Sequence, residues 1–522
     1  MAILGTLLKR GIRLRESLEQ DYTSPFDLQK AELRKLLIAA KETYFGRYHY
    51  FKTILNGFKE QDQNLFYSYF KSNVPIHDYN SISEEWWSKS REGIKGVCWP
   101  GKVKYYALSS GTSGAPSKYI PVTKEALKSM QKAGVRQLLA LSKLEIDSKY
   151  YETHILMVGG STDLKFNGTY FEGDLSGITT GQIPIWLQGI AKPGKRIAKA
   201  SDWDTKLEEM VHKAKDWNVG VLVGVPSWIQ LLLEKIIAHY KVQTIHDIWP
   251  NLKIFVHGGV SFKPYKRGFE KLLGESIHYM ETYLASEGFI AFQDKPNHSA
   301  MKLILNNGIF YEFIPFTNRN FDRNGQLEKD PETINIKEVK ERQEYALLIS
   351  TNAGAWRYLV GDVIEFTNKK EAEIIIKGRT KHFLSLCGEH LSLDNMNEAL
   401  ELTASQLEIT VKEFTVCGES FDSLFAHRWY IGTDDPVNKG RFRKQLDKNL
   451  KQLNDDYRVE RHAALKELFV EFLPSSIFYS WMRSQGKEGG QHKFPRVLNA
   501  ERQKSWNQFI ASKTRVTISK VK

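Results

Sequence analysis

The feature that most constrains the fold is a regular alternation of strand-like and helical segments between residues 153 and 283. Short apolar runs rich in β-branched residues are separated by longer runs whose apolar residues recur at helical spacing. The strand-like runs are 153–158, 219–225, 252–257 and 277–283, and the helical runs are 204–215, 227–239 and 263–273. This alternation predicts βαβ units around a largely parallel sheet, because parallel neighbours need a crossover connection that is usually a helix.

The flanking segments predict the rest of the organisation. Helical spacing covers residues 22–58, 64–87 and 124–141, and residues 103–108 turn extended. Short strands at 308–315, 344–350, 362–367 and 373–377 are typical of a smaller antiparallel sheet or barrel. After residue 378 the order is helix, strand, strand, helix, strand, helix up to residue 485.

The chain is therefore expected to be an α/β protein of two domains. Residues 1–378 are predicted to form a large N-terminal domain of mixed sheets with flanking helices and a small barrel-like β subdomain. Residues 379–522 are predicted to form a smaller C-terminal α+β domain.

Composition and charge exclude several classes of protein. Hydrophobic residues make up 41% of the chain and charged residues 26%, as in folded globular proteins and unlike disordered ones. The three cysteines, Cys98, Cys387 and Cys417, have no CxxC spacing, which argues against a disulfide framework and a cysteine zinc site. A reducing compartment, the cytoplasm, is therefore expected. The net charge of +13 is spread beside Asp and Glu, so we expect no nucleic-acid partner but some attraction of anionic small molecules.

We expect no membrane-spanning segment. The longest apolar stretch, residues 219–233, contains Gly220, Gly224 and Pro226 and falls short of the roughly 20 residues that a spanning helix needs. Near the start, an apolar run at residues 3–8 precedes its basic residues, the reverse of a signal peptide. An amphipathic helix packed on the body of the protein is expected there, with a membrane-surface helix as the alternative.

The best candidate for phosphate binding is the loop after the extended run 103–108. It consists of Ser109, Ser110, Gly111, Thr112, Ser113 and Gly114, and Lys118 follows. Glycines let backbone N–H groups approach phosphates, and hydroxyls donate to phosphate oxygens. Loops of this composition are also ordinary surface connectors. By contrast, residues 189–196 have the spacing of a P-loop, but Arg196 stands where a Ser or Thr hydroxyl must meet magnesium.

Four later segments, in their order along the chain, add to this loop. They are residues 283–288 (YLASEG), 356–362 (WRYLVGD), 378–381 (GRTK) and 489–496 (GGQHKFPR). Together with the loop they resemble the adenylate-forming superfamily of acyl-CoA synthetases, peptide-synthetase adenylation domains and firefly luciferase. Within it, the chain resembles the Gretchen Hagen acyl acid amido synthetases, plant enzymes that conjugate jasmonate or auxin to amino acids. The amino-acid sequences of its motifs are closer to those of the bacterial branch of this family.

This resemblance implies an ATP site. Residues 109–114 would hold the β- and γ-phosphates, Ser286 would contact the α-phosphate, and Glu287 would ligate Mg²⁺, a cation that prefers oxygen ligands. Lys493 would bring positive charge to the α-phosphate while one anion attacks another. Lys381 would be the hinge of a mobile C-terminal domain.

The resemblance also implies contacts to the nucleoside. Tyr283 would stack on adenine opposite Gly258 and Gly259, with a core aromatic as the alternative. Asp362 would accept both ribose hydroxyls, since a carboxylate offers two oxygens. Arg379 would donate to the same ribose, or form a salt bridge between the domains.

The implied function is ATP-dependent adenylation of a carboxylic acid, followed by acyl transfer to an amine such as an amino acid. The acyl pocket would include Val225 and Trp228 of the turn 224–228, and Tyr311 of the strand 311–313. One alternative hands the acyl group to coenzyme A or another thiol. The other is a nucleotide-binding relative without catalytic activity.

Overall fold

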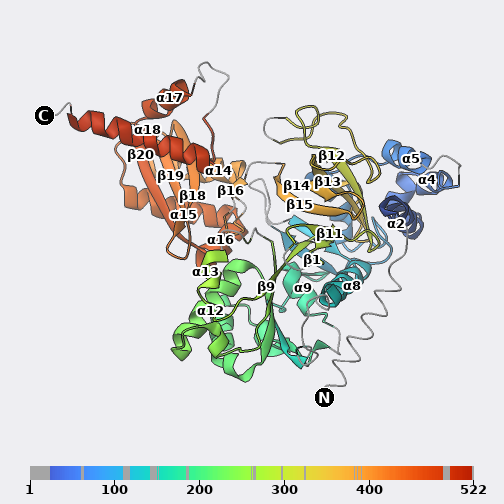
Figure 1. The fold of residues 1–522 in the computed structure, drawn as a ribbon. Helices are drawn as coiled ribbons and strands as arrows, with labels where there is room; N and C mark the ends of the chain where they lie inside the picture. Colours follow the sequence, from blue (N-terminus) through green and yellow to red (C-terminus); the bar gives the residue numbers. More distant parts are fainter. Residues whose placement is uncertain are drawn as a thin grey trace. The chain divides into compact units, whose positions relative to one another are not determined.

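The computed structural model of the 522-residue chain describes residues 24–59, 64–109, 118–140, 150, 152–183, 187–259, 262, 266–295, 298–322, 325–380, 383–384, 386–389, 391–485 and 494–519. Within these, the described parts of residues 1–109 and 118–381 form one compact unit, and those of residues 382–522 form a second. The division falls close to the boundary expected at residue 378. Figure 1 follows the chain through both units.

Helices open the larger unit, as the helical spacing predicted. Several begin where a side chain accepts a hydrogen bond from a free backbone N–H group: Ser24 accepts from Asp27, Thr43 from Gly46 and Asp78 from Ser81. The elements are α2 (Pro25–Ala40), α3 (Tyr44–Tyr48), α4 (Phe51–Asn56), α5 (Leu65–Asn73), α6 (Tyr79–Ile82), a π-helical turn (Ser83–Trp87) and α7 (Ser88–Arg91).

An 11-stranded sheet occupies the centre of the larger unit, in the order β12-β13-β14-β15-β11-β10-β9-β8-β7-β3-β6. The portion from β9 to β6 is parallel throughout, so the predicted parallel sheet is confirmed. Its strands are β3 (His154–Val158), β6 (Ala191–Lys192), β7 (Val219–Gly224), β8 (Ile254–Gly258) and β9 (His278–Ala285).

Helices cover both faces of the parallel portion. On one face, Met130 and Ala133 of α8 share a buried cluster with Ile254 and Val256 of β8. The opposite face carries Phe255, whose ring stacks on Phe269 of α13 at a centroid distance of 4.8 Å. The helices of this region are α8 (Lys124–Ala140), α9 (Leu175–Thr180), α10 (Lys195–Ala198), α11 (Trp203–Lys213), α12 (Pro226–Tyr240) and α13 (Lys266–Glu270).

The remaining strands of the sheet pair antiparallel. They are β10 (Gly288–Phe292), β11 (Met301–Leu303), β12 (Ile309–Pro315), β13 (Glu344–Thr351), β14 (Tyr358–Asn368) and β15 (Glu373–Arg379). Their pairing follows the expectation, but they do not form a sheet of their own, because β11 pairs with both β10 and β15 and joins them to the parallel strands. Sequence periodicity gives the face that a strand buries and is silent on which sheet the strand joins.

A second, 4-stranded sheet in this unit has the order β2-β1-β5-β4. Its strands are β1 (Tyr105–Ser109), β2 (Lys118–Val122), β4 (Lys165–Phe166) and β5 (Phe171–Gly173). β1 and β2 are antiparallel neighbours, and Ser109 is in register with Lys118. The two ends of the serine- and glycine-rich segment are thereby held side by side.

A buried ion pair lies in the core where α5 meets β12 and β14. The Arg357 Nε atom is 3.0 Å from Oε1 of Glu312, and neither side chain is more than 5% exposed. Arg357 also donates to the carbonyl of Val74 and the hydroxyl of Thr333, and Tyr67 donates to Glu312. Every charge is therefore compensated, as burial of ions requires.

The second unit has the predicted order of elements up to residue 485, except that two helices lie between β19 and β20 where one was expected. Its elements are the short pair β16 (Phe383–Leu384) and β17 (Leu391–Ser392), then α14 (Leu393–Leu407), β18 (Glu413–Phe421), β19 (Leu424–Gly432), α15 (Lys439–Leu453), α16 (Asp455–Ala463), β20 (Leu465–Leu473), α17 (Ser475–Ser484) and α18 (Ala500–Ser519). The strand order is β18-β19-β20. Tyr430 faces the cluster of Phe478 and Trp506 from α17 and α18, whereas His427 faces Tyr457 of α16. Helices thus cover both faces.

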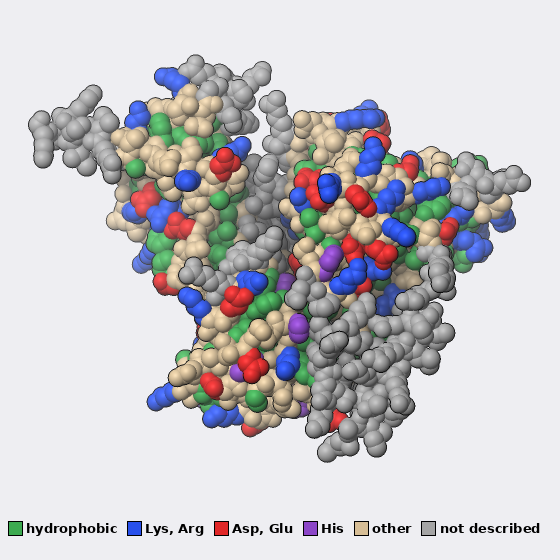
Figure 2. Space-filling model, in the orientation of Figure 1, with side chains coloured by type: hydrophobic (Ala, Val, Ile, Leu, Met, Phe, Trp, Pro, Cys, Tyr) green, Lys and Arg blue, Asp and Glu red, His purple; other side chains and the backbone are tan. Residues whose placement is uncertain are grey.

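The surface carries mixed charge. On the face shown in Figure 2, Lys and Arg side chains lie among Asp and Glu rather than in one basic field. Cys98, Cys387 and Cys417 are all buried free thiols. Within the part of the chain that the structure describes, no helix combines the length and apolar character needed to cross a membrane. The N-terminal helix expected within residues 1–20 and the segment 110–117 lie outside the described residues.

Candidate active site

The carboxyl ends of the parallel strands form the framework of the candidate site. Ligands of α/β sheets bind at this edge, beyond the strand ends. At the end of β8 the backbone approaches β9 so closely that a Cβ atom on Gly258 would lie 2.4 Å from the carbonyl oxygen of Thr282. The next residue, Gly259, has a φ of +82° and faces Val225, which precedes α12. Gly258, Gly259 and Val225 therefore lie at one place on this edge.

A cluster of charged and phenolic side chains connects β9 with β14 and β15. The Tyr283 hydroxyl donates to Oδ2 of Asp362 at 2.5 Å. The Arg379 Nε atom lies 3.3 Å from Oδ1 of the same carboxylate, so Asp362 uses its two oxygens for two partners. Asp362 and Arg379 face each other in the register of β14 and β15, and Arg379 also donates to the carbonyl of Val360.

Glu287 belongs to the same cluster. It lies with Ser286 in the two-residue turn between β9 and β10, because Ala285 pairs with Gly288. Burial raises the pKa of Glu287, and the charge of Asp362 adds to this increase. Lys118 and Arg379 act in the opposite direction, so both cations interact with this carboxylate.

The phenols of the cluster are held in the neutral form. Burial and the charge of Asp362 raise the pKa of Tyr283 well above its ordinary value. Burial and the charge of Glu287 do the same to Tyr358. The pKa of Arg379 is raised as well, because attraction to Asp362 and its neighbours outweighs burial. The cluster thus presents oxygen acceptors and a permanent cation to a common region.

The alternative interpretation of Tyr283 as a core aromatic has support. Its side chain is only 6% exposed and belongs to the main buried cluster of the unit. Arg379 likewise makes an ion pair within this unit, with Asp362. Both residues can still offer their polar atoms to a ligand at the rim of the cluster, where Arg379 is 31% exposed.

The expected acyl-pocket residues do not all lie together. Trp228 opens α12 next to Val225, and its ring packs against Trp203 of α11 at 4.7 Å. Tyr311 is fully buried on β12, and its hydroxyl donates to the carbonyls of Ile290 and Ile304. Its contacts are therefore those of a core residue.

The structure describes only some of the expected phosphate-site residues. Ser109 ends β1, and Ser286 and Glu287 follow the end of β9. Ser110, Gly111, Thr112, Ser113, Gly114, Lys381 and Lys493 lie outside the described residues. The placement of Ser109 and Lys118 as register partners fixes where the segment 110–117 leaves and re-enters the sheet. The Lys118 ammonium lies over the ring of Tyr79, 5.4 Å from its centroid.

The donor set suits a metal that is shared with a substrate. Among the described residues, no group of three or more His, Cys, Asp or Glu side chains could hold a metal ion by itself. Mg²⁺ is commonly bound through one or two carboxylates together with substrate phosphates and water. The Glu287 carboxylate, at the turn after β9, offers one hard oxygen ligand of this kind.

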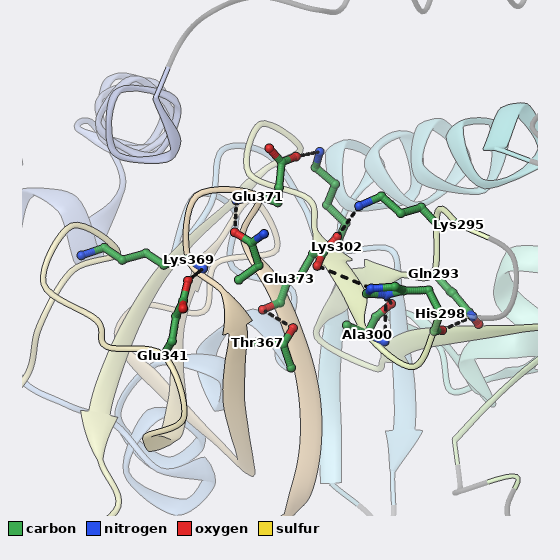
Figure 3. A network of polar contacts seen from close by, with 11 residues as sticks. Gln293, Lys295, His298, Ala300, Lys302, Glu341, Thr367, Lys369, Glu371 and Glu373 are labelled. Atoms are coloured by element: carbon green, nitrogen blue, oxygen red, sulfur yellow. Dashed lines mark hydrogen bonds and ion pairs between the residues drawn. The ribbon is translucent and has the colours of Figure 1, made fainter.

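A separate polar network lies on the hairpin β10–β11 and on β15 (Figure 3). The Lys295 ammonium is 2.6 Å from Oε1 of the buried Glu373, and the His298 Nε2 atom is 3.9 Å from Oε2. Lys302 pairs with Glu371 at 3.3 Å. Since each carboxylate already has a lysine partner, this network is best explained as a link between β11 and β15.

Sequence reasoning overlooked Tyr358 and Trp203. Tyr358 lies within the segment 356–362, but the strand was expected to begin only at residue 362, whereas β14 begins at Tyr358. Trp203 precedes the predicted helix 204–215 by one residue, and no sequence pattern indicated that it packs near Val225 and Trp228.

Comparison with known proteins agrees with this geometry. The chain matches the GH3 family N-terminal domain over residues 14–161 and 162–277, the GH3 family central domain over 302–373 and the GH3 family C-terminal domain over 394–502. It is 26% identical over 210 residues to a probable indole-3-acetic acid-amido synthetase GH3.9 of Oryza sativa subsp. japonica, a match that covers 38% of this chain and 45% of the rice protein. The chain thus spans less than half the length of this relative.

Solved structures share the fold across nearly the whole chain. The GH3.15 acyl acid amido synthetase is similar with a TM-score of 0.58 and 18% identity, covering 96% of each chain. A 2-hydroxyisobutyryl-CoA ligase in its thioesterification state is similar with a TM-score of 0.57 and 15% identity, covering 92% of this chain and 91% of the ligase. The chain therefore shares its fold with both proteins. Because it matches the N-terminal, central and C-terminal domains of the GH3 family, the chain belongs to that family.

Proposed function

We propose that this chain is an ATP-dependent acyl acid amido synthetase. In the first step a substrate carboxylate attacks the α-phosphorus of ATP; a new P–O bond forms and pyrophosphate leaves. In the second step an amine, such as that of an amino acid, attacks the acyl carbonyl; a C–N bond forms, AMP leaves, and the amine loses a proton. The observation that carries the proposal is the convergence of Tyr283, Glu287, Asp362 and Arg379 at the strand ends of a GH3-family fold.

The cluster supports this function by its charge and donor pattern. Asp362 lies where one carboxylate oxygen could accept from ribose hydroxyls while Arg379 donates, since both side chains reach the rim. Lys118 and Arg379 supply positive charge near Glu287, which favours bound phosphates. We propose that Ser109 to Gly114 cradle the β- and γ-phosphates, that Ser286 contacts the α-phosphate, and that Glu287 ligates Mg²⁺. The metal would offset phosphate charge during adenylation.

Further parts of the proposal concern the whole chain. Residues 1–378 would bind ATP and the acid, with Val225 and Trp228 near the acyl group and Gly258 and Gly259 beside adenine; residues 379–522 would rotate about Lys381 and carry Lys493. We also propose that the chain belongs to the bacterial branch of the family, on the basis of the amino-acid sequences of residues 282–289, 356–362 and 486–496. Activity in the cytoplasm fits the three buried, free cysteines.

The test is ATP–pyrophosphate exchange across a panel of carboxylic acids, because it reports adenylation without knowledge of the acceptor. Lys493→Ala is expected to lower exchange by about 10²- to 10³-fold while ATP binding is retained, since one positive charge at a transferring phosphate is worth that much. Lys487→Ala removes the same charge from the same glycine-flanked segment and is the matched control, with exchange within about 3-fold of wild type.

Two results would contradict the proposal. Wild-type exchange in Lys493→Ala removes the assignment of that lysine. Absence of exchange with every acid in the panel counts against adenylation. Mass spectrometry of the products then separates an amide from a thioester. This separation is needed because the fold resembles an amido synthetase and a CoA ligase almost equally, at TM-scores of 0.58 and 0.57.

A further inference from the structure

Tyr79 links α6 to the edge of the 4-stranded sheet. It is the first residue of α6, and its side chain is partly buried against the main apolar cluster of the larger unit. Its hydroxyl oxygen accepts a hydrogen bond from the backbone N–H of Tyr119 at 2.8 Å. Tyr119 lies on β2, the outermost strand of that sheet, and an edge strand presents backbone N–H groups on its outer side. The Tyr79 hydroxyl therefore takes the place of the acceptor that a further strand would supply.

The ring of Tyr79 also contacts the residue before Tyr119. The Lys118 ammonium lies over this ring, 5.4 Å from its centroid, within the distance at which an aromatic face attracts a cation. Lys118 is in register with Ser109 at the opposite end of β1 and β2. The hydroxyl and the ring of Tyr79 thus hold two successive residues at the start of β2.

The segment before Tyr79 is bound to the 11-stranded sheet. The N–H of His77 donates to the carbonyl of Arg357 at 2.9 Å, and the N–H of Leu359 donates to the carbonyl of His77 at 2.8 Å. The His77 ring nitrogen Nδ1 is 2.9 Å from the carbonyl oxygen of Trp356. The segment before α6 thus pairs with the start of β14 like a short strand.

Aromatic side chains reinforce this link. The Tyr79 ring meets the edge of Trp87 at a centroid distance of 6.2 Å, and Trp87 packs against Tyr358 of β14 at 5.6 Å. Residues 77–79 are therefore a connecting segment between two sheets. One end is fixed to β14, the strand that carries Asp362, and the other end is fixed to β2.

From these contacts we infer that Tyr79 is a positioning residue, which keeps the Lys118 ammonium in place relative to Asp362 so that one ATP molecule can meet both. The inference rests on the proposed function, in which Lys118 supplies positive charge for the phosphates and Asp362 meets the ribose. AMP has the same ribose as ATP but lacks the β- and γ-phosphates. Loss of the connection should therefore weaken the binding of ATP and spare that of AMP.

The test compares these two nucleotides. Tyr79→Phe removes the hydroxyl and keeps the ring. Isothermal titration calorimetry of the full-length protein, without a carboxylic acid substrate, gives the affinities for ATP with Mg²⁺ and for AMP. We expect the ATP affinity of Tyr79→Phe to fall by about 3- to 10-fold, the effect of one hydrogen bond, and its AMP affinity to stay within about 2-fold of wild type.

Tyr345→Phe is the matched control. The Tyr345 hydroxyl belongs to the same unit and also accepts from a backbone N–H at 2.8 Å, that of Lys340. This substitution should leave both affinities within about 2-fold of wild type. A second measurement asks whether Tyr79 acts through Lys118. In a Lys118→Met protein, Tyr79→Phe should lower the ATP affinity by less than about 2-fold, because substitutions that remove one shared contact are not additive.

Three outcomes overturn the inference and leave the proposed function intact. The first is wild-type ATP affinity in Tyr79→Phe. The second is an equal loss of ATP and AMP affinity, because it reflects a general disturbance of the unit. The third is an undiminished effect of Tyr79→Phe in the Lys118→Met protein. If the wild-type protein binds neither ATP nor AMP, the proposed function fails, and the inference fails with it.

Discussion

Two glutamates, Glu287 and Glu389, show how the partners of a carboxylate affect its pKa. Burial raises the pKa of Glu287, which has a phenol and a second carboxylate nearby. Glu389 is fully buried, but contact with His427 and with backbone N–H groups lowers its pKa to about 2. The His427 Nε2 atom is 2.7 Å from Glu389 Oε1, and the N–H groups of Leu386 and Cys387 donate to the same carboxylate. Hydrogen bonds to the ionised form outweigh desolvation here.

This difference predicts a pH dependence of the second unit. Because the folded pKa of Glu389 is about 2 and the unfolded value is 4.5, its stabilising effect is complete above pH 4.5 and is lost as the pH falls towards 2. Hydrogen exchange of a β19 peptide, Leu424–Gly432, in wild type and Glu389→Gln should therefore differ at pH 6 and converge as the pH is lowered.

The larger unit supplies the internal control for that measurement. A β7 peptide covering Val219–Gly224 should exchange alike in both proteins at every pH, because Glu389 belongs to the second unit. A difference in β19 that stays constant from pH 6 to pH 3 would contradict the assigned charge state of Glu389.

At the scale of elements, strand and helix types were predictable and their connections were not. The parallel run β3–β7–β8–β9 followed from its alternation with helices, and Asp362, Arg379, Tyr283 and Glu287 were expected to meet because of the family resemblance. The start of β14 at Tyr358 was not predicted. The preceding residue, Arg357, has a positive φ, and hydrophobic periodicity does not reveal backbone angles. Tyr311 is buried on β12, and the alternation of a strand does not show which of its buried faces borders a pocket, so its place in the acyl pocket stays a prediction.

The packing of α9 against the turn after β3 predicts a sharp difference between two glycines in helices. A Cβ atom on Gly177 would lie 2.0 Å from the carbonyl oxygen of Ser161, whereas one on Gly134 of α8 would meet nothing within 4 Å. Gly177→Ala should therefore destabilise the larger unit by about 1–3 kcal/mol through overpacking. Gly134→Ala should stabilise it by about 0.5–1 kcal/mol, because alanine favours helix.

Urea denaturation measures both substitutions. The midpoint should fall for Gly177→Ala and rise for Gly134→Ala, with the denaturant dependence unchanged. If the two variants shift in the same direction, the close approach of α9 to Ser161 is not a determinant of stability.

For the whole molecule, the division into two units fits a protein whose parts act in turn. The larger unit contains Tyr283, Glu287, Asp362 and Arg379, and the proposed catalytic Lys493 belongs to the chain that follows residue 382. The sequence predicts a boundary near residue 378, because the segment after Gly378 changes from strand pattern to polar residues. The proposed rotation cannot be read from a pattern of residues, because it depends on the energies of two arrangements of the same chain.

The proposed hinge can be tested at Lys381. Proline fixes φ and also restricts the preceding residue, so Lys381→Pro should hinder rotation. We expect ATP–pyrophosphate exchange within about 3-fold of wild type, and amide formation lowered by about 10-fold or more. Lys381→Ala, which removes the side chain but leaves φ free, should preserve both reactions. Undiminished amide formation in the proline variant would rule out rotation about this residue.

The pairing of His77 with Arg357 and Leu359 also has a consequence for biosynthesis. His77 and Arg357 are about 280 positions apart in the sequence. Tyr283 can contact Asp362 only after the strands between them have been translated. A ribosome must therefore release most of the larger unit before any nucleotide-binding contact can form. Such distant pairings fold slowly and leave apolar strands uncovered meanwhile. Chaperone capture of the nascent chain would be strongest before residue 358 emerges.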